Sequence, residues 1–237
     1  MRTAIVLQAR LGSSRLPGKV LALLGGRTML SQCIDRLRAH SQLPVIVATT
    51  TQAEDDLVAR EAARCGADVV RGPVDDVLRR FAMAVQTYGL ERVVRATADN
   101  PAVDLDAPKR TLDLLDLTHA DHIVERGLPI GCVVEAVSAK AILQADELAI
   151  EPYDREHVTP YIKRLRRFHT MQALAPGHVR ARTLRLTVDT AEDLDFVRRT
   201  FASVDLPEPF PLEAIIAAAQ ALEPLAAPRG NSRTERR

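Results

Sequence analysis

The sequence has no tryptophan, and aromatic residues make up only 3% of its 237 residues. Its hydrophobic content is still 46%, so aliphatic side chains must form the core. A chain of this length buries enough apolar surface to fold without disulfides or a structural metal. Cysteine is scarce too: Cys33, Cys65 and Cys132 are far apart and show no CxxC or Cys/His spacing. That pattern supports neither a disulfide framework nor a zinc site.

Long hydrophobic runs and an excess of one charge are also missing. No apolar run approaches the roughly 18 residues of a membrane-spanning helix. The run within residues 1–8 is too short for a signal peptide, so we expect a cytoplasmic protein. The 32 basic and 31 acidic residues give a net charge of +1. A sequence-independent nucleic-acid binder is therefore not expected, because phosphate neutralisation needs a basic excess.

Lysine is rare, and the ends of the chain differ in charge. Only four of the 32 basic residues are lysines, and one of them, Lys19, stands in an arginine-rich stretch. Residues 229–237 hold four basic groups and one acid, which is typical of a disordered tail. We find no internal repeat and no linker before it, so residues 1–228 are predicted to form a single domain.

Short apolar runs alternate with helical patterns along the chain. Strands are predicted at residues 4–7, 45–48, 68–70, 92–97, 121–125, 133–137 and 185–188. Helices are predicted at residues 29–37, from a capping box at 51–54 to 65, at 75–88, 139–148, 190–201 and 212–222, with a loop and a basic helix within 153–167. This alternation predicts an α/β fold with a mostly parallel sheet and helices on both faces.

A polar and basic segment follows the first predicted strand. Residues 8–19 contain two glycines, two serines, two arginines and Lys19. Ligands of open α/β sheets bind beyond the carboxyl ends of the strands. Backbone N–H groups, hydroxyls and cations at that place suit a polyphosphate. The segment is not a Walker A loop, because Val20 follows Lys19. Composition alone leaves a phosphate-binding loop and a solvated basic loop equally open.

Two acids follow later strands. Asp99 ends the strand at 92–97, and Asp189 follows the predicted strand at 185–188. Two carboxylates beside a phosphate loop suit Mg²⁺, which takes oxygen ligands and completes its shell with substrate phosphates. Each acid alone also fits a simpler reading, Asp99 as a turn residue and Asp189 as a helix cap.

Two further segments are dense in polar residues. Residues 153–161 mix acids, bases and aromatic rings, which suits an acceptor pocket and equally a surface salt-bridge cluster. Residues 70–78 contain a Gly-Pro turn followed by Asp75 and Asp76, which bind a ligand or simply begin a helix.

In this order, the segments resemble the spore-coat-polysaccharide-type cytidylyltransferases, a family similar to the CMP-sialate and CMP-keto-deoxy-octulosonate synthetases. The resemblance runs over residues 2–201. It rests on four stretches, namely Gln8-Ala9-Arg10 with 12–19, Arg71-Gly72 with 75–78, residues 155–161, and residues 186–190 with 192–194.

The resemblance implies a nucleotide-diphospho-sugar-transferase-like (Rossmann-like) α/β fold, a three-layer sandwich with a mixed, mostly parallel sheet. It implies a Mg²⁺-dependent nucleotidyltransferase that transfers CMP from CTP to a sugar acid, sugar phosphate or related acceptor and releases pyrophosphate, in polysaccharide or glycoconjugate biosynthesis. The implied partners are CTP and a small anionic acceptor, with no nucleic acid and no membrane, and the related synthetases suggest a homodimer.

The resemblance also assigns roles to residues. It implies catalytic roles for Arg10, Lys19 and Asp99, and metal binding by Asp99 and Asp189. The implied nucleotide-binding residues are Gln8, Ala9, Arg10, Gly12, Ser13, Ser14, Arg15, Lys19, Arg71 and Asp75. The implied acceptor-binding residues are Glu135, Arg155, Glu156 and His157. Two positions depart from the family pattern: Ala98 stands where many relatives have glycine, and Val133 where relatives usually have an acid.

Two other functions remain open from the sequence. One is a glycosyltransferase of the same fold that uses a nucleotide sugar, because such enzymes hold metal through an Asp-x-Asp run and Asp104-Leu105-Asp106 has that spacing. The other is a non-catalytic nucleotide-binding module, in which Val133 marks lost chemistry.

Overall fold

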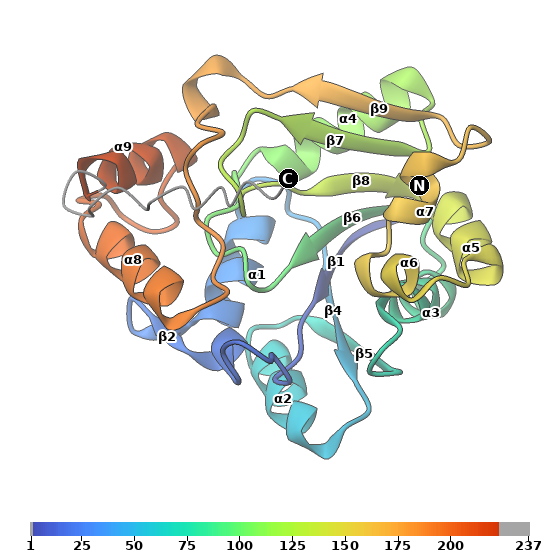
Figure 1. Ribbon diagram of the computed structural model, residues 1–237, viewed down its shortest axis with the longest axis horizontal. Helices are drawn as coiled ribbons and strands as arrows, with labels where there is room; N and C mark the ends of the chain where they lie inside the picture. The colour runs from blue at the N-terminus through green and yellow to red at the C-terminus, as the bar shows by residue number, and fades with distance from the viewer. Residues whose placement is uncertain (1, 223–237) are drawn as a thin grey trace, which may run out of the picture.

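The computed structural model describes residues 2–222 (Figure 1), so the predicted tail at 229–237 lies outside the described residues, as does the predicted domain end at 228. A seven-stranded sheet crosses the molecule in the order β5-β4-β1-β6-β8-β7-β9. In chain order its strands are β1 (Thr3–Gln8), β4 (Val45–Thr50), β5 (Asp68–Gly72), β6 (Arg92–Thr97), β7 (His122–Arg126), β8 (Glu135–Ser138) and β9 (Thr170–Leu174). A small hairpin pairs β2 (Leu23–Leu24) with β3 (Arg27–Thr28).

The sheet is mixed but mostly parallel, as predicted. β5, β4, β1 and β6 are parallel neighbours, and β9 runs parallel to β7. Only β8 is antiparallel to its neighbours β6 and β7. Gln8 at the end of β1 pairs with Ala48 of β4 and Thr97 of β6. The carboxyl ends of three central strands therefore meet at one edge of the sheet.

Helices cover both faces of the sheet, which completes the predicted three layers (Figure 1). They are α1 (Met29–Ala39), α2 (Asp56–Arg64), α3 (Val77–Tyr88), α4 (Ala107–Thr118), α5 (Ala139–Leu148), α6 (Pro152–His157), α7 (Pro160–Arg164), α8 (Ala191–Ala202) and α9 (Leu212–Leu222). Alternation along β1 explains the two cores. Ile5 and Leu7 face the core built with α1, α4, α8 and α9, whereas Ala4 and Val6 face the core built with α3, α5 and α7.

Two local predictions were wrong, and the helix α4 and the strand β9 were missing from the predicted elements. Residues 185–188 form no strand, because their backbone bonds to loops: Leu186 N–H donates to the Ile130 carbonyl at 2.8 Å and Val188 N–H to the Asp99 carbonyl at 2.9 Å. The capping box at 51–54 is not formed, since a 3₁₀ turn at Ala53–Asp55 precedes α2 and no side chain caps it. The edge strand β9 was missed because its mostly exposed residues show no buried run.

The search for membrane-spanning elements found no helix in residues 2–222 that is long and apolar enough to cross a bilayer.

Candidate active site

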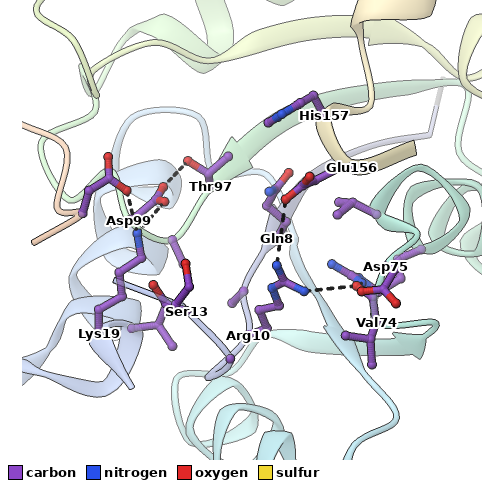
Figure 2. Close-up of a pocket in the computed structure, with 18 of the residues that line it drawn as sticks. Gln8, Arg10, Ser13, Lys19, Val74, Asp75, Thr97, Asp99, Glu156 and His157 are labelled. Carbon is purple, nitrogen blue, oxygen red and sulfur yellow. Dashed lines mark hydrogen bonds and ion pairs between the residues drawn. The ribbon is translucent and has the colours of Figure 1, made fainter. Parts of the chain in front are cut away.

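A cavity of about 510 Å³ opens at the carboxyl ends of β1 and β6 (Figure 2). Most of the residues predicted to form the site line it. They are Gln8, Ala9, Arg10, Gly12, Ser13, Ser14, Arg15, Lys19, Asp75, Asp99, Glu156, His157 and Asp189. Five separate chain segments supply these residues, so the fold gathers groups that lie up to 181 residues apart in the numbering, from Gln8 to Asp189.

The segment after β1 is held in one shape by a buried acid. The Asp55 carboxylate accepts a hydrogen bond from Leu11 N–H at 2.7 Å and a second one from the Thr50 hydroxyl. Gly18 N–H donates to the Leu11 carbonyl at 3.0 Å, which closes the loop on itself. Gly18 has a φ of +73°, a conformation that side chains disfavour. These bonds fix the backbone from which the basic and hydroxyl side chains enter the cavity.

Lys19 joins the two acids that were predicted as metal ligands (Figure 2). Its Nζ donates to Asp99 Oδ2 at 2.9 Å, to Asp189 Oδ1 at 3.1 Å and to the Val188 carbonyl at 2.7 Å. The lysine side chain is only 9% exposed. An ammonium with three short contacts in a nearly closed site is a strong charge-assisted link. It ties the loop after β1 to the ends of β6 and of the segment at 185–189.

Further cations surround Asp189. Arg15 contacts its Oδ1 at 2.8 Å, and Arg185 donates to its Oδ2 at 2.6 Å. Burial raises the pKa of Asp189, but the bonds from Lys19 and Arg185 and the charge of Arg15 outweigh this and lower the pKa below its usual range. Asp189 N–H donates to Asp193 at 3.0 Å, the same acid that forms the capping box of α8 with Thr190. The carboxylate is thereby ionised and fixed in direction.

The two carboxylates suit a divalent cation on one condition. Asp99 Oδ2 and Asp189 Oδ1 converge on a single point, which the Lys19 ammonium occupies. Within residues 2–222 no cluster of three or more His, Cys, Asp or Glu side chains is placed to hold a metal. Two carboxylate oxygens fit Mg²⁺ only if phosphate oxygens and water complete the shell. The two carboxylates can bind Mg²⁺ only if the Lys19 ammonium moves away from them.

The opposite wall of the cavity carries another set of charges. Arg10 Nη1 donates to the Val74 carbonyl at 3.4 Å, and Arg10 Nη2 lies 3.9 Å from Glu156 (Figure 2). Arg80 also lines the cavity and donates to the Val74 carbonyl at 3.0 Å. Burial, reinforced by the nearby charge of Arg10, lowers the pKa of Arg80 to about 10. It remains a cation at neutral pH, so this wall adds positive charge to the cavity.

Three predicted site residues do not line this cavity. Arg71 turns to the outside and binds the Thr50 and Gln52 carbonyls, at 2.8 and 2.9 Å, and Asp56. These partners at the neighbouring β4 end and in the segment after it hold its guanidinium outside the cavity. Arg155 donates to Asp76 at 3.0 Å and to Asp146 at 2.8 Å, which fastens α6 to α3 and α5.

Glu135 is the third, and it belongs to a buried charge cluster behind the cavity. It accepts from Lys163 at 3.1 Å and from Arg95 at 3.5 Å, and His122 Nε2 lies 3.7 Å away. Burial alone raises the pKa of Glu135, but Arg95, His122 and Lys163 together hold it far below its usual range. Val133, where the family resemblance led us to expect an acid, is partly buried and packs against the core built with α1 and α4.

The structure adds site residues that the sequence analysis missed. Arg95 and Thr97 of β6 line the cavity, as does Arg80 of α3. Arg95 Nη2 donates to Gln8 Oε1 at 3.3 Å, and the Thr97 hydroxyl donates to Asp99 Oδ1 at 2.6 Å. One signal was available: a basic residue inside a central, otherwise apolar strand is unusual and points to a partner or a ligand.

The Asp-x-Asp run does not reach the cavity. Asp104 is buried against Arg110 at 2.6 Å, and Asp106 accepts from His40 at 2.8 Å, just before α4. Neither acid lines the cavity. The feature that favoured a glycosyltransferase is thus a structural pair at the start of a helix.

Comparison with known proteins points to one family. A family model described as cytidylyltransferase matches residues 4–221. The chain is 32% identical over 207 residues to the spore coat polysaccharide biosynthesis protein SpsF of Bacillus subtilis, covering 83% of this chain and 85% of the relative. It is 26% identical over 194 residues to a 3-deoxy-manno-octulosonate cytidylyltransferase of Anaeromyxobacter dehalogenans, covering 74% and 79%.

A solved structure agrees with this. A cytidylyltransferase from Leptospira borgpetersenii superposes with a TM-score of 0.87 at 28% sequence identity, over 95% of this chain and 96% of that one. The likeness extends over nearly the whole of both chains, so it includes the sheet, both helical layers and the cavity edge.

Proposed function

The chain belongs to the cytidylyltransferase family, and we propose that it transfers CMP from CTP to a small anionic acceptor and releases pyrophosphate. The observation that carries this proposal is the cavity itself. It combines a fixed loop rich in cations and hydroxyls with two carboxylates at the carboxyl end of the sheet. A triphosphate needs such cations, and nucleotidyl transfer needs its α-phosphorus to be held and neutralised.

The loop after β1 is the proposed triphosphate site. Arg10, Arg15 and Lys19 supply positive charge, and Ser13 and Ser14 supply hydroxyl donors. An acceptor oxygen attacks the α-phosphorus, a new O–P bond forms, and the bond to the β-phosphate oxygen breaks. Arg10 and Lys19 then stabilise the charge that develops on the departing pyrophosphate. Asp75 lies beside this site on the α3 side of the cavity.

Asp99 and Asp189 are the proposed holders of Mg²⁺. When bound, Mg²⁺ would polarise phosphate oxygens and neutralise part of their charge. Lys19 must release both carboxylates for this, and the triphosphate offers its ammonium a new anionic partner. Lys19 thus keeps the acid pair neutralised in the empty site and supplies its charge to the nucleotide in the loaded one.

The acceptor is proposed to enter beside α6. Glu156 and His157 face the cavity there, and Arg155 fixes their helix to α3 and α5. Arg95 lies in the same wall and offers a cation to a carboxylate or phosphate of the acceptor. Glu135 acts behind it by holding Arg95 in place. On the family resemblance we also propose a cytoplasmic homodimer that serves polysaccharide or glycoconjugate biosynthesis.

The test is pyrophosphate release by the purified protein. Each of CTP, UTP, ATP and GTP is supplied with Mg²⁺ and a panel of sugar acids, sugar phosphates and phosphonates. We expect release with CTP and an anionic acceptor, and none with CTP alone. A parallel assay with UDP-sugars and the same acceptors detects glycosyl transfer. Release of UDP there, without pyrophosphate release from CTP, would refute the proposal.

A further inference from the structure

Most arginine side chains within residues 2–222 have a partner. Those of residues 2–222 that form no side-chain hydrogen bond, ion pair or ring contact are Arg60, Arg126, Arg166, Arg180 and Arg182. Three of these five, Arg126, Arg180 and Arg182, line a single groove. Unpaired cations gathered at one hollow are unlike the rest of the molecule, where acids and carbonyls neutralise the guanidinium groups.

The groove has a volume of about 730 Å³ and shares no lining residue with the catalytic cavity. It lies between the end of β7 and the segment that follows β9. Ala175 N–H donates to the Arg126 carbonyl at 3.0 Å, and Ala181 N–H to the Gly127 carbonyl at 2.9 Å. These bonds fix the two backbones from which the three arginines project.

Gly127 makes room for one of these arginines. It has a φ of +95°, and a Cβ at this position would lie 3.0 Å from Arg180 Cγ. A side chain at 127 would therefore strain the backbone and push the Arg180 stem out of the groove. The absence of a side chain at Gly127 therefore leaves room for the Arg180 stem to line the groove.

Within residues 2–222, no acid lines the groove. Its other lining residues are Gly127, Leu174, Ala181 and Thr183, none of which carries a charge. Three guanidinium groups around an acid-free hollow repel one another and are best satisfied by an anion with several charges. A planar guanidinium matches the two oxygens of a phosphate or a carboxylate.

We propose that this groove binds a small oligoanion that carries two or more phosphate or carboxylate groups. The site is separate from the catalytic one but lies near it. Strands β6 and β7 are parallel to each other, because both are antiparallel to β8. Arg126, the last residue of β7, therefore lies at the same sheet edge as Asp99, which follows β6. The Ile130–Leu184 backbone bond, at 2.9 Å, lies in the segment between the two sites. The ligand is either a free oligophosphate or a short acidic sugar chain.

The experiment counts anion sites by isothermal titration calorimetry with inorganic tripolyphosphate. We expect two classes of site in the unmodified protein, one in the catalytic loop and one in this groove. The triple variant Arg126→Ala, Arg180→Ala, Arg182→Ala should lose the groove class, with affinity reduced at least about 100-fold, because each charge-assisted contact contributes roughly tenfold or more. The matched control is Arg60→Ala with Arg166→Ala, two equally unpaired arginines outside the groove, which should keep both classes.

The outcomes separate this inference from the proposed catalysis. If the triple variant keeps both classes, the groove is not an anion site and the inference is wrong. If the unmodified protein shows one class that the triple variant loses, the groove is supported and the catalytic loop fails as a triphosphate site. A second arm uses trigalacturonate in place of tripolyphosphate. Loss of only that binding in the triple variant identifies the ligand as an acidic sugar chain, and loss of only tripolyphosphate binding identifies a phosphate.

Discussion

Replacing Lys19 by methionine should weaken the fold and at the same time improve metal binding. Methionine keeps the unbranched stem and removes the ammonium. Loss of the ammonium leaves Asp99 and Asp189 facing each other without the cation that they share in the unmodified protein. Breaking a buried ion pair on one side costs about 3–5 kcal/mol. Arg15 and Arg185 remain on Asp189, and the Asp99 side chain is 31% exposed, so we expect a smaller loss in the free energy of unfolding, about 2–3 kcal/mol.

The assay is thermal unfolding with and without MnCl₂, in the absence of nucleotide. For a domain of this size the loss corresponds to roughly 4–12 °C in Tm. Divalent cation should then stabilise the variant more than the unmodified protein, because the carboxylates no longer hold an ammonium. A cation at 100 times its Kd adds about 2.7 kcal/mol, which restores most of the loss.

A matched control is Lys109→Met. Lys109 is 67% exposed and contacts Asp113 at 2.8 Å on the surface of α4, so its loss should leave both the Tm and the Mn²⁺ response nearly unchanged. An equal Mn²⁺-induced shift in the Tm of the unmodified protein and of Lys19→Met would refute this prediction. Equal shifts would mean that Lys19 and the cation do not compete for the two carboxylates.

Three further predictions follow from the same contacts. Asp99→Asn should reduce kcat at least about 100-fold in the pyrophosphate assay with little change in circular dichroism, and turnover near that of the unmodified protein would remove the metal assignment. Arg71→Ala should lower the free energy of unfolding by about 1–2 kcal/mol but change the Kd for CTP less than about twofold, because the Arg71 guanidinium binds carbonyls at the β4 end, outside the cavity. A large loss of CTP affinity in calorimetry would contradict this. Glu135→Gln should lower the free energy of unfolding by about 3 kcal/mol at pH 7. The pKa of Glu135 is lower in the folded state than in the unfolded state, so the stability difference between the two proteins should stay constant above about pH 5.5 and shrink as the pH falls below the unfolded-state pKa of about 4.3. Urea unfolding at each pH measures this difference. A difference independent of pH would show that ionisation of Glu135 is not what stabilises the cluster.

The regular elements could be predicted where one periodicity dominates. The strand at 92–97 and the helices at 139–148 and 212–222 have the predicted bounds, because their apolar spacing is long and uninterrupted. Prediction failed where backbone groups find partners far away in sequence. Residues 185–188 look like a strand, but their partners are two loops, and no local pattern encodes that choice.

The candidate site divides in the same way. Residues 8–19 stand out by composition alone, and the structure places most of them in the cavity. Arg71 and Arg155 stand out equally, yet both guanidinium groups are used to fasten neighbouring elements. Arginine serves ligands and scaffolds with the same atoms, so only the location of its partners separates the two roles.

The sequence by itself determined the α/β class, the polar segments that follow the central strands, and the family. These follow from local periodicity and from contiguous motifs. Only the tertiary structure decided which charges meet. The fold brings Lys19 into contact with Asp99 and Asp189, which are 80 and 170 positions away in the sequence. It also gathers Arg126, Arg180 and Arg182 around one groove that no acid of the described residues, 2–222, lines. Electrostatic partnership depends on distances of a few ångströms, and chain order does not specify those distances.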